Sequence, residues 1–206
     1  MDYETIIETD RIISTMEAVK ARGIAVELVE SKSEALKRVL EIVPDGASIV
    51  TAASVTLNEI RFMDELTSGK HNWRSLSSEI RAENDPDKRA LLRRKSSLVD
   101  FSLGSVNAIA ETGEIVVASG TGSQLFPYLS VMNVLWVAGV QKIVPSLDDA
   151  IRRVREYCAP KVEEMGRRTL GREGSGVIGK ILIFENEATL LRRNVRLILV
   201  NESVGF

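Results

Sequence analysis

Apolar residues recur with two different spacings along the chain, and the alternation between them predicts a succession of helices and strands. The first predicted helix, residues 2–22, has an apolar face made of Ile6, Ile13, Met16 and Val19. Helical spacing and capping residues predict further helices over residues 31–43, 55–66, 85–95 and 146–158. Apolar runs between turn-forming residues predict strands over residues 24–29, 48–52, 134–138, 178–184 and 195–200.

Two more short apolar runs, residues 107–110 and 115–119, flank a turn that contains Gly113. Glycine adopts the positive φ that tight turns require, so this pattern predicts a β-hairpin. Pro160 is expected either to kink the helix before it or to start a second helix that ends at Gly166.

Helices that alternate with strands in the first half predict an α/β fold with a mainly parallel sheet flanked by helices. The hairpin and the last two strands are expected to add antiparallel strands. At 206 residues the length suits one core, and we expect a single domain over residues 1–206.

Two loops of small residues, 51–56 and 119–124, each follow a predicted strand. Ligands of parallel sheets lie beyond the carboxyl ends of the strands, where free backbone N–H groups can hold an anion. The candidate ligand-binding residues are Ser54, Thr56, Gly120, Thr121, Gly122 and Gln124. The alternatives are that the first loop only caps a helix and that the second is an ordinary strand-to-helix turn.

Two glutamates are the candidate acid or base groups. Glu59 lies one turn into the helix that follows the first loop, and Glu111 lies in the hairpin turn. Each has a simpler explanation, because glutamates on helix surfaces and at hairpin turns are usually solvated.

The 27 basic and 29 acidic residues give a net charge of −2, which provides no general attraction to nucleic acid or to anionic membranes. The arginine doublets, such as Arg93-Arg94, are therefore read as solvated faces. No apolar run reaches the length of a membrane span, and the acidic N-terminus is unlike a signal peptide. We expect a cytoplasmic protein.

The scarcity of ligating residues argues against metal chemistry. The chain has one cysteine, Cys158, and one histidine, His71, too few for a closed transition-metal site, and it lacks a dinucleotide-binding fingerprint. We therefore expect no metal and no cofactor. Cys158 continues a helical apolar stripe and Trp136 lies in the middle of a strand, so both are expected in the core.

Five segments in order make the chain similar to the LUD-domain family of lactate-utilization proteins. They are residues 54–60 (SVTLNEI), 103–116 (LGSVNAIAETGEIV), 119–122 (SGTG), 136–156 (WVAGVQKIVPSLDDAIRRVRE) and 195–206 (VRLILVNESVGF). The resemblance implies a fold like that of ribose-phosphate isomerases and CoA transferases, whose ligands bind at strand ends. Relatives often have glycine after the Glu-Ile of the first segment, where this chain has Arg61.

The resemblance also implies a function. The first hypothesis is an accessory or ligand-binding component of organic-acid (lactate) utilization that binds a small anionic metabolite. The cysteine clusters of longer iron–sulfur members are missing, so redox centres would belong to iron–sulfur oxidoreductase subunits as partners. The alternative is a stand-alone isomerase or acyl/CoA transferase that uses Glu59 or Glu111. A homodimer is compatible with both.

Overall fold

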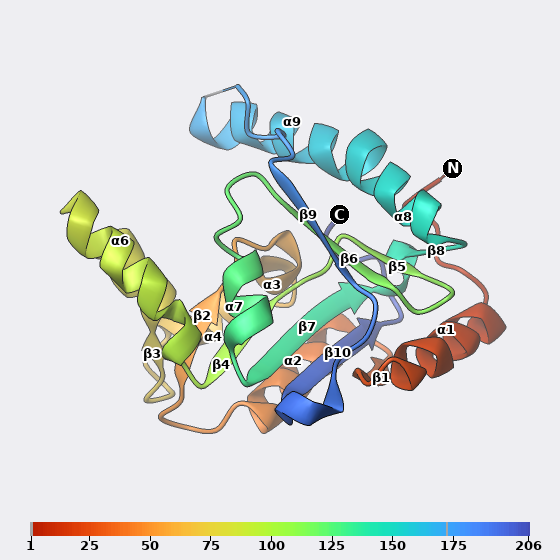
Figure 1. Ribbon diagram of the computed structural model, residues 1–206, viewed down its shortest axis with the longest axis horizontal. Helices are drawn as coiled ribbons and strands as arrows, with labels where there is room; N and C mark the ends of the chain where they lie inside the picture. The colour runs from red at the N-terminus through yellow and green to blue at the C-terminus, as the bar shows by residue number, and fades with distance from the viewer. Residues whose placement is uncertain (1, 172) are drawn as a thin grey trace.

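The computed structural model describes residues 2–171 and 173–206, and it contains two β-sheets that lie face to face between layers of helices (Figure 1). All neighbouring strands of the larger sheet are parallel. In spatial order its strands are β1 (Ala25–Val29), β10 (Asn194–Val200), β7 (Asn133–Gly139), β4 (Phe101–Gly104), β2 (Ser48–Thr51) and β3 (Arg74–Ser75). The predicted α/β class with a mainly parallel sheet is confirmed.

The smaller sheet is mixed. In spatial order its strands are β8 (Ile143–Val144), β5 (Ala108–Ala110), β6 (Ile115–Ser119) and β9 (Lys180–Phe184). Strands β5 and β6 form the predicted antiparallel hairpin, and β9 runs antiparallel to β6. The expectation that both last strands are antiparallel is wrong for β10, which lies between two parallel neighbours in the larger sheet.

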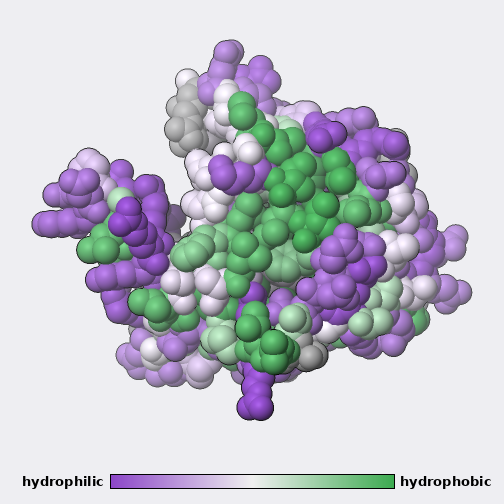
Figure 2. All heavy atoms as spheres, viewed as in Figure 1, coloured by the Kyte–Doolittle hydropathy of each residue, from purple (hydrophilic) through white to green (hydrophobic). Residues whose placement is uncertain are grey.

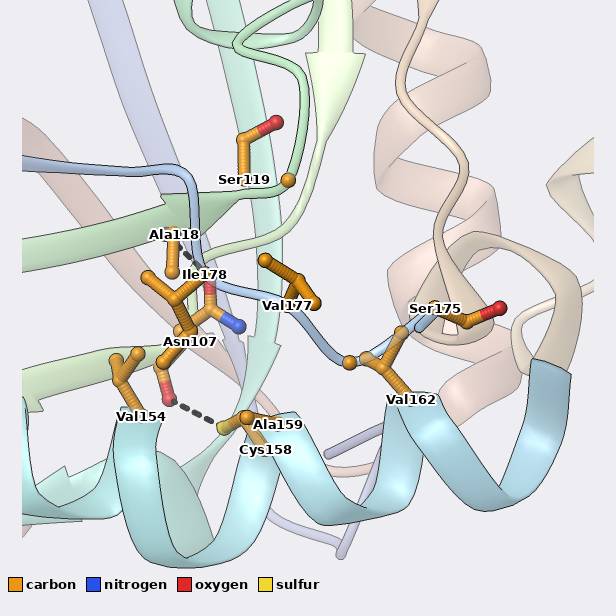
Figure 3. A pocket seen from close by; sticks show the side chains of 12 residues that line it. Asn107, Ala118, Ser119, Val154, Cys158, Ala159, Val162, Ser175, Val177 and Ile178 are labelled. Atoms are coloured by element: carbon orange, nitrogen blue, oxygen red, sulfur yellow. Dashed lines mark hydrogen bonds between the residues drawn. The ribbon is translucent and has the colours of Figure 1, made fainter. Parts of the chain in front are cut away.

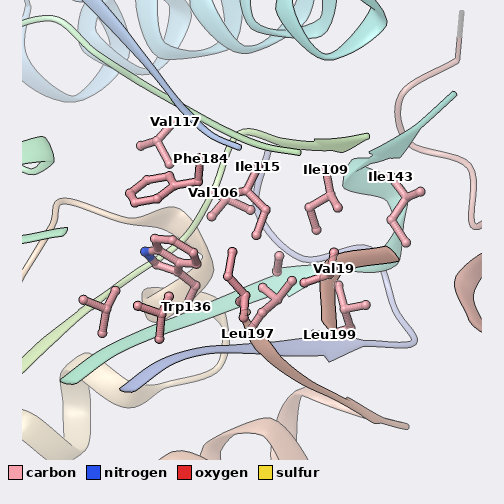
Figure 4. Packing of buried hydrophobic residues seen from close by; sticks show 14 of the residues in the cluster. Val19, Val106, Ile109, Ile115, Val117, Trp136, Ile143, Phe184, Leu197 and Leu199 are labelled. Atoms are coloured by element: carbon pink, nitrogen blue, oxygen red, sulfur yellow. The ribbon is translucent and has the colours of Figure 1, made fainter. Parts of the chain in front are cut away.

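The two sheets share a core between their facing surfaces. Ile109, Ile115, Val117 and Phe184 extend from the smaller sheet towards Trp136 of β7 (Figure 4). Trp136 is fully buried, as expected, and it meets Phe184 and Tyr128 edge-on with ring centroids 4.9 and 5.6 Å apart. The opposite face of the larger sheet packs on α2 (Lys32–Ile42), α3 (Val55–Glu59) and α4 (Phe62–Thr67).

Three expected helices differ from those observed. The first, α1 (Thr9–Ala21), begins later than expected and buries Ile12, Thr15 and Val19, while Ile13 is exposed. The helix expected over 55–66 is divided into α3 and α4, because Arg61 has φ +65° and interrupts it. Glycine adopts this left-handed conformation more readily than arginine does.

The third difference concerns Pro160. The chain is helical from α8 (Leu147–Arg153) through a π-helical turn, Val154–Cys158, into α9 (Ala159–Leu170). The wider turn provides room for the proline ring, and it avoids the α-helical hydrogen bond that proline, which has no N–H, cannot donate. The expected start of a second helix at Pro160 agrees with α9, which has this proline in its first turn, but the expected end at Gly166 is wrong because α9 continues to Leu170.

Three further α-helices lie on the side of the molecule where β2 and β4 are. They are α5 (Leu76–Ala82), α6 (Pro86–Arg94) and α7 (Leu125–Ser130), and of these α5 packs on β2. Helix α6 begins, as expected, at Pro86 behind an Asp85 cap and forms a hydrophilic arm that stands apart from the body of the molecule (Figures 1 and 2). No helix in the described part of the chain is both long and apolar enough to cross a membrane.

Candidate functional site

A cleft of about 1170 Å³ opens beside the carboxyl ends of β2, β4 and β6. Its lining includes residues of α3, α5, α6, α7 and α9. The hollow beside the α6 arm is visible in Figure 2. Hydroxyl groups line it from Thr51, Ser54, Thr56, Ser77, Ser96, Ser102, Ser105, Ser119 and Ser123. This volume is at the upper end of what small-molecule sites occupy.

The structure brings the two predicted loops to this one cleft, although not every candidate residue lines it. Ser54, Thr56, Gly120 and Gln124 are lining residues, whereas Thr121 and Gly122 are not. Ser54 also caps α3 by accepting a hydrogen bond from the N–H of Leu57 (3.2 Å). Gln124 donates to the Ala118 carbonyl (3.0 Å).

Gly122 has a conformational role beside the cleft. Its φ is +85°, and its N–H donates to Ser119 Oγ (2.9 Å). A Cβ atom added here would lie 2.8 Å from Cδ of Lys180. The glycine therefore closes the turn after β6, which distinguishes it from the lining residue Gly120.

Both predicted glutamates lie outside the cleft lining. The Glu111 carboxylate pairs with Arg11 of α1. Glu59 accepts a hydrogen bond from the Gly205 N–H (3.1 Å) and pairs with Lys32 (3.5 Å). Among the described residues that line the cleft there is no aspartate or glutamate side chain.

Sequence reasoning missed the functional group at the floor of the cleft, Lys142. This side chain is only 1% exposed and follows β7 in a short connection to β8. Its Nζ lies 3.1 Å from Thr56 Oγ1, 3.0 Å from Ser105 Oγ and 3.2 Å from the Val106 carbonyl oxygen. The available signal was the pair Gln141-Lys142, which interrupts the apolar run that continues β7.

Burial lowers the pKa of Lys142 from its ordinary value to about 7. Burial is the largest cause of this value, to which the charge of Arg153 also contributes by lowering the pKa, while Cys158 and Glu59 act in the opposite direction. Desolvation disfavours the charged form of an amine, and no carboxylate contacts the Nζ to compensate. The floor of the cleft therefore holds an amine whose two protonation states are of similar free energy near neutral pH.

Three arginines add positive charge to one wall. Arg81 of α5 and Arg93 and Arg94 of α6 line the cleft, and none of them forms an ion pair with another described residue. Arg93 and Arg94 are both exposed to solvent, as expected. Their exposed face also borders the cleft, which the sequence did not predict. Lysine and arginine side chains thus supply all the side-chain charge of the described lining.

Gly104 permits the close packing of Tyr128 at the cleft. A Cβ atom added at Gly104 would lie 1.7 Å from the phenolic oxygen of Tyr128, which donates to the Ser105 carbonyl (3.3 Å). We expect Gly104→Ala to destabilise the protein by about 1–3 kcal/mol, because the ring must move within a packed core. Urea unfolding of the two proteins would measure this change, and equal stability would show that the Tyr128 ring moves aside without cost.

A second, small cavity of about 60 Å³ adjoins the cleft between β6, α9 and the loop before β9 (Figure 3). Cys158 lines it and is buried, as expected, with its thiol 3.9 Å from the Asn107 carbonyl oxygen. The guanidinium of buried Arg153 donates to Cys158 Sγ (3.1 Å) and lies over the Tyr157 ring at 4.9 Å. Burial lowers the pKa of this guanidinium.

No group of three or more His, Cys, Asp or Glu side chains that could hold a metal ion exists among the described residues. His71 stacks on Trp73 with ring centroids 4.0 Å apart and is half-buried. The polar side chains that line the cleft are hydroxyls, amides and the cations of lysine and arginine.

A sequence profile of the LUD domain matches residues 12–169. The chain belongs to the LUD-domain family. The fold of this LUD-domain protein is similar to a crystal structure of a DUF162 family protein from Deinococcus radiodurans, with a TM-score of 0.57 and 12% identity over 95% of this chain and 98% of that one. A weaker similarity, TM-score 0.30 and 14% identity, covers 68% of the LUD-domain chain and 46% of eIF2B beta from Chaetomium thermophilum. No curated protein sequence matches.

Proposed function

We propose that the cleft binds a small organic anion and that the protein is an accessory or ligand-binding component of organic-acid utilization, with lactate metabolism as its setting. The observation that carries this proposal is Lys142, a buried amine at the floor of the cleft without a carboxylate partner. Membership of the LUD-domain family supports the setting.

The physical support comes from the energy of the buried charge. An unpaired ammonium loses several kcal/mol when it leaves water, and natural proteins seldom keep such a group without a use for it. A carboxylate bound beside Lys142 would offset that loss and favour the protonated amine. The hydroxyls of Thr56 and Ser105 and the arginines of α5 and α6 would bind the remaining polar atoms.

Partners and location follow from the same proposal. Electron transfer in organic-acid oxidation would take place on iron–sulfur oxidoreductase subunits that act with this protein in the cytoplasm. The alternative, an isomerase or CoA transferase with a glutamate as its reactive group, receives no support from the cleft, since Glu59 and Glu111 do not line it.

A binding screen tests the proposal. Lactate, pyruvate, longer hydroxy and oxo acids and phosphorylated acids would be compared by thermal shift and calorimetry. A true ligand at about 100 times its Kd should stabilise the protein by about 2.7 kcal/mol. We expect Lys142→Met to weaken binding about tenfold or more, which corresponds to about 1.4 kcal/mol.

Two controls separate the cleft from general charge effects. Lys37→Met removes an exposed lysine of α2, and the double change Arg167→Gln, Arg168→Gln removes an exposed doublet that does not line the cleft. Binding should survive both changes but weaken when Arg93 and Arg94 are replaced by glutamine. The absence of binding by every acid, or equal losses in the control and cleft variants, would contradict the proposal.

A further inference from the structure

The hydrogen-bonding shell of Lys142 accommodates its amine in both protonation states. An ammonium has three N–H donors, and the shell offers the hydroxyls of Thr56 and Ser105 and the carbonyl of Val106 as three acceptors. A neutral amine has two donors and one lone pair. A hydroxyl can reverse its role and donate to that lone pair, so loss of the proton leaves no polar atom of the shell unpaired.

The Lys142 amine also lies where a ligand in the cleft could reach it. Lys142, Thr56 and Ser105 all line the cleft, so the side chain is buried within the protein and yet borders the space where a ligand would lie. The charged or titratable groups that influence it are Arg153 of α8, Cys158 of the π-helical turn and Glu59 of α3. None of the three donates to or accepts from its Nζ.

We propose that Lys142 is a nucleophile that forms an imine with the carbonyl carbon of an oxo acid bound in the cleft. This rests on the proposed function for the anionic part of the ligand. For an oxo acid the arginines of α5 and α6 would hold the carboxylate in place of Lys142, so that the amine keeps its neutral form and meets the carbonyl carbon. The combination of a cationic wall and a buried amine selects for a molecule that carries both a carboxylate and a ketone or aldehyde. Lactate, which has a hydroxyl in place of the carbonyl, would bind without reacting.

The reaction balances without an oxidant, reductant or metal. The lone pair of Nζ attacks the carbonyl carbon, and the carbonyl oxygen takes up a proton to give a carbinolamine. A second proton converts that hydroxyl into water, which leaves as the C=N bond forms, and the nitrogen gives up its protons to the shell. Thr56 and Ser105 lie at hydrogen-bond distance from Nζ and can carry these protons. Hydrolysis by the reverse path regenerates the free lysine.

The lowered pKa supports this role, because only the neutral amine has the lone pair that attacks. An ordinary lysine is neutral in only about one molecule in three thousand at pH 7, whereas a pKa of about 7 makes about half of the Lys142 side chains neutral. Lys142 should therefore react at neutral pH while exposed lysines such as Lys37 do not.

Reductive trapping tests the proposal. The full-length protein would be incubated with pyruvate or 2-oxobutyrate and sodium cyanoborohydride at neutral pH, then analysed by intact mass and peptide mapping. We expect a single reduced adduct on Lys142, none with lactate, and none in Lys142→Met or Lys142→Arg. The arginine variant keeps the positive charge and removes the reactive amine. Lys37→Met should be modified as the wild type is.

A second variant addresses proton transfer. Thr56→Val preserves the side-chain shape and should slow trapping by about a hundredfold, the lower end of what positioned proton transfer contributes. An adduct spread over surface lysines, or one that persists in Lys142→Met, would overturn the proposal. If an oxo acid stabilises the protein without forming an adduct, the imine is refuted and the anion site stands. If no acid stabilises the protein or reacts with it, both proposals fail.

Discussion

Replacing Trp136 with alanine is expected to reduce the free energy of unfolding by about 3–5 kcal/mol, the largest effect of any single substitution considered for this protein. The indole fills the space between the two sheets, where it is fully buried and packs edge-on against Tyr128 and Phe184. Its removal would leave a cavity that neither sheet can close without losing strand pairing. Chemical denaturation measured by circular dichroism would give the difference.

The second tryptophan provides a matched control. Trp73 is half-buried, stacks on His71 and donates from its indole nitrogen to the Pro44 carbonyl (2.9 Å). We expect Trp73→Ala to cost clearly less than Trp136→Ala, and Trp136→Phe to fall between wild type and Trp136→Ala. Equal losses at the two tryptophans would contradict the assignment of Trp136 to the shared core of the sheets.

Raising the pH from 7 is expected to stabilise the wild-type protein relative to Lys142→Met. The pKa of Lys142 is about 7 in the folded protein and 10.5 as an ordinary lysine. Between these values the unfolded chain binds more protons than the folded one, so the contribution of this group to unfolding free energy rises with pH. The slope approaches about 1.4 kcal/mol per pH unit, and the penalty is complete below pH 7 and absent above 10.5.

Urea unfolding of both proteins across this range would measure the slope. Other titrating groups are present in both chains, so their effects cancel in the difference between the two curves. Parallel curves would show that Lys142 titrates at its ordinary pKa and has access to water in the folded state. A bound anion should reduce the slope, because it favours the protonated amine.

The sequence predicted those elements whose side chains carry a strong pattern. Long apolar runs predicted β7 and β10. The capping serines Ser31 and Ser146 predicted the starts of α2 and α8. In the structure Ser31 accepts a hydrogen bond from the N–H of Glu34 (3.2 Å), and Ser146 accepts one from the N–H of Asp149 (3.1 Å). The parallel pairing of β10 was not predictable from its sequence neighbours. Its partners β1 and β7 are far away along the chain, and only the whole topology selects them.

Elements with weak local patterns were missed. Strand β4 has only four residues and includes a serine and a glycine, both poor strand formers, and α5 contains two serines and few apolar residues. Both elements depend on tertiary contacts with β2, since β4 pairs with that strand and α5 packs against it.

For the candidate site, the sequence indicated which loops converge, but it did not indicate Lys142, the residue on which the proposed function rests. Loop residues such as Ser54 and Gly120 could be predicted, but the expected reason, a shared edge of one parallel sheet, holds only for the first loop. Gly120 follows β6 of the smaller mixed sheet, and it reaches the cleft because the two sheets face each other. The role of Lys142 depends on being buried beside Thr56 and Ser105, which are distant along the chain. Burial of a charged side chain depends on the assembled core, so the pattern of residues around Lys142 in the sequence does not predict it.

The π-helical turn at Val154–Cys158 suggests how the shape of the cleft can change during evolution. A π turn holds one residue more than an α turn, so it is the mark that a single-residue insertion leaves in a helix. Losing that residue would rotate everything after it by about 100°, and Val162 and Met165 of α9 would turn away from the cleft wall. A chain with a different length here would present other side chains to the cleft while Lys142 stays in place. A change of length in this one helix would therefore alter the lining of the cleft without any substitution at its floor.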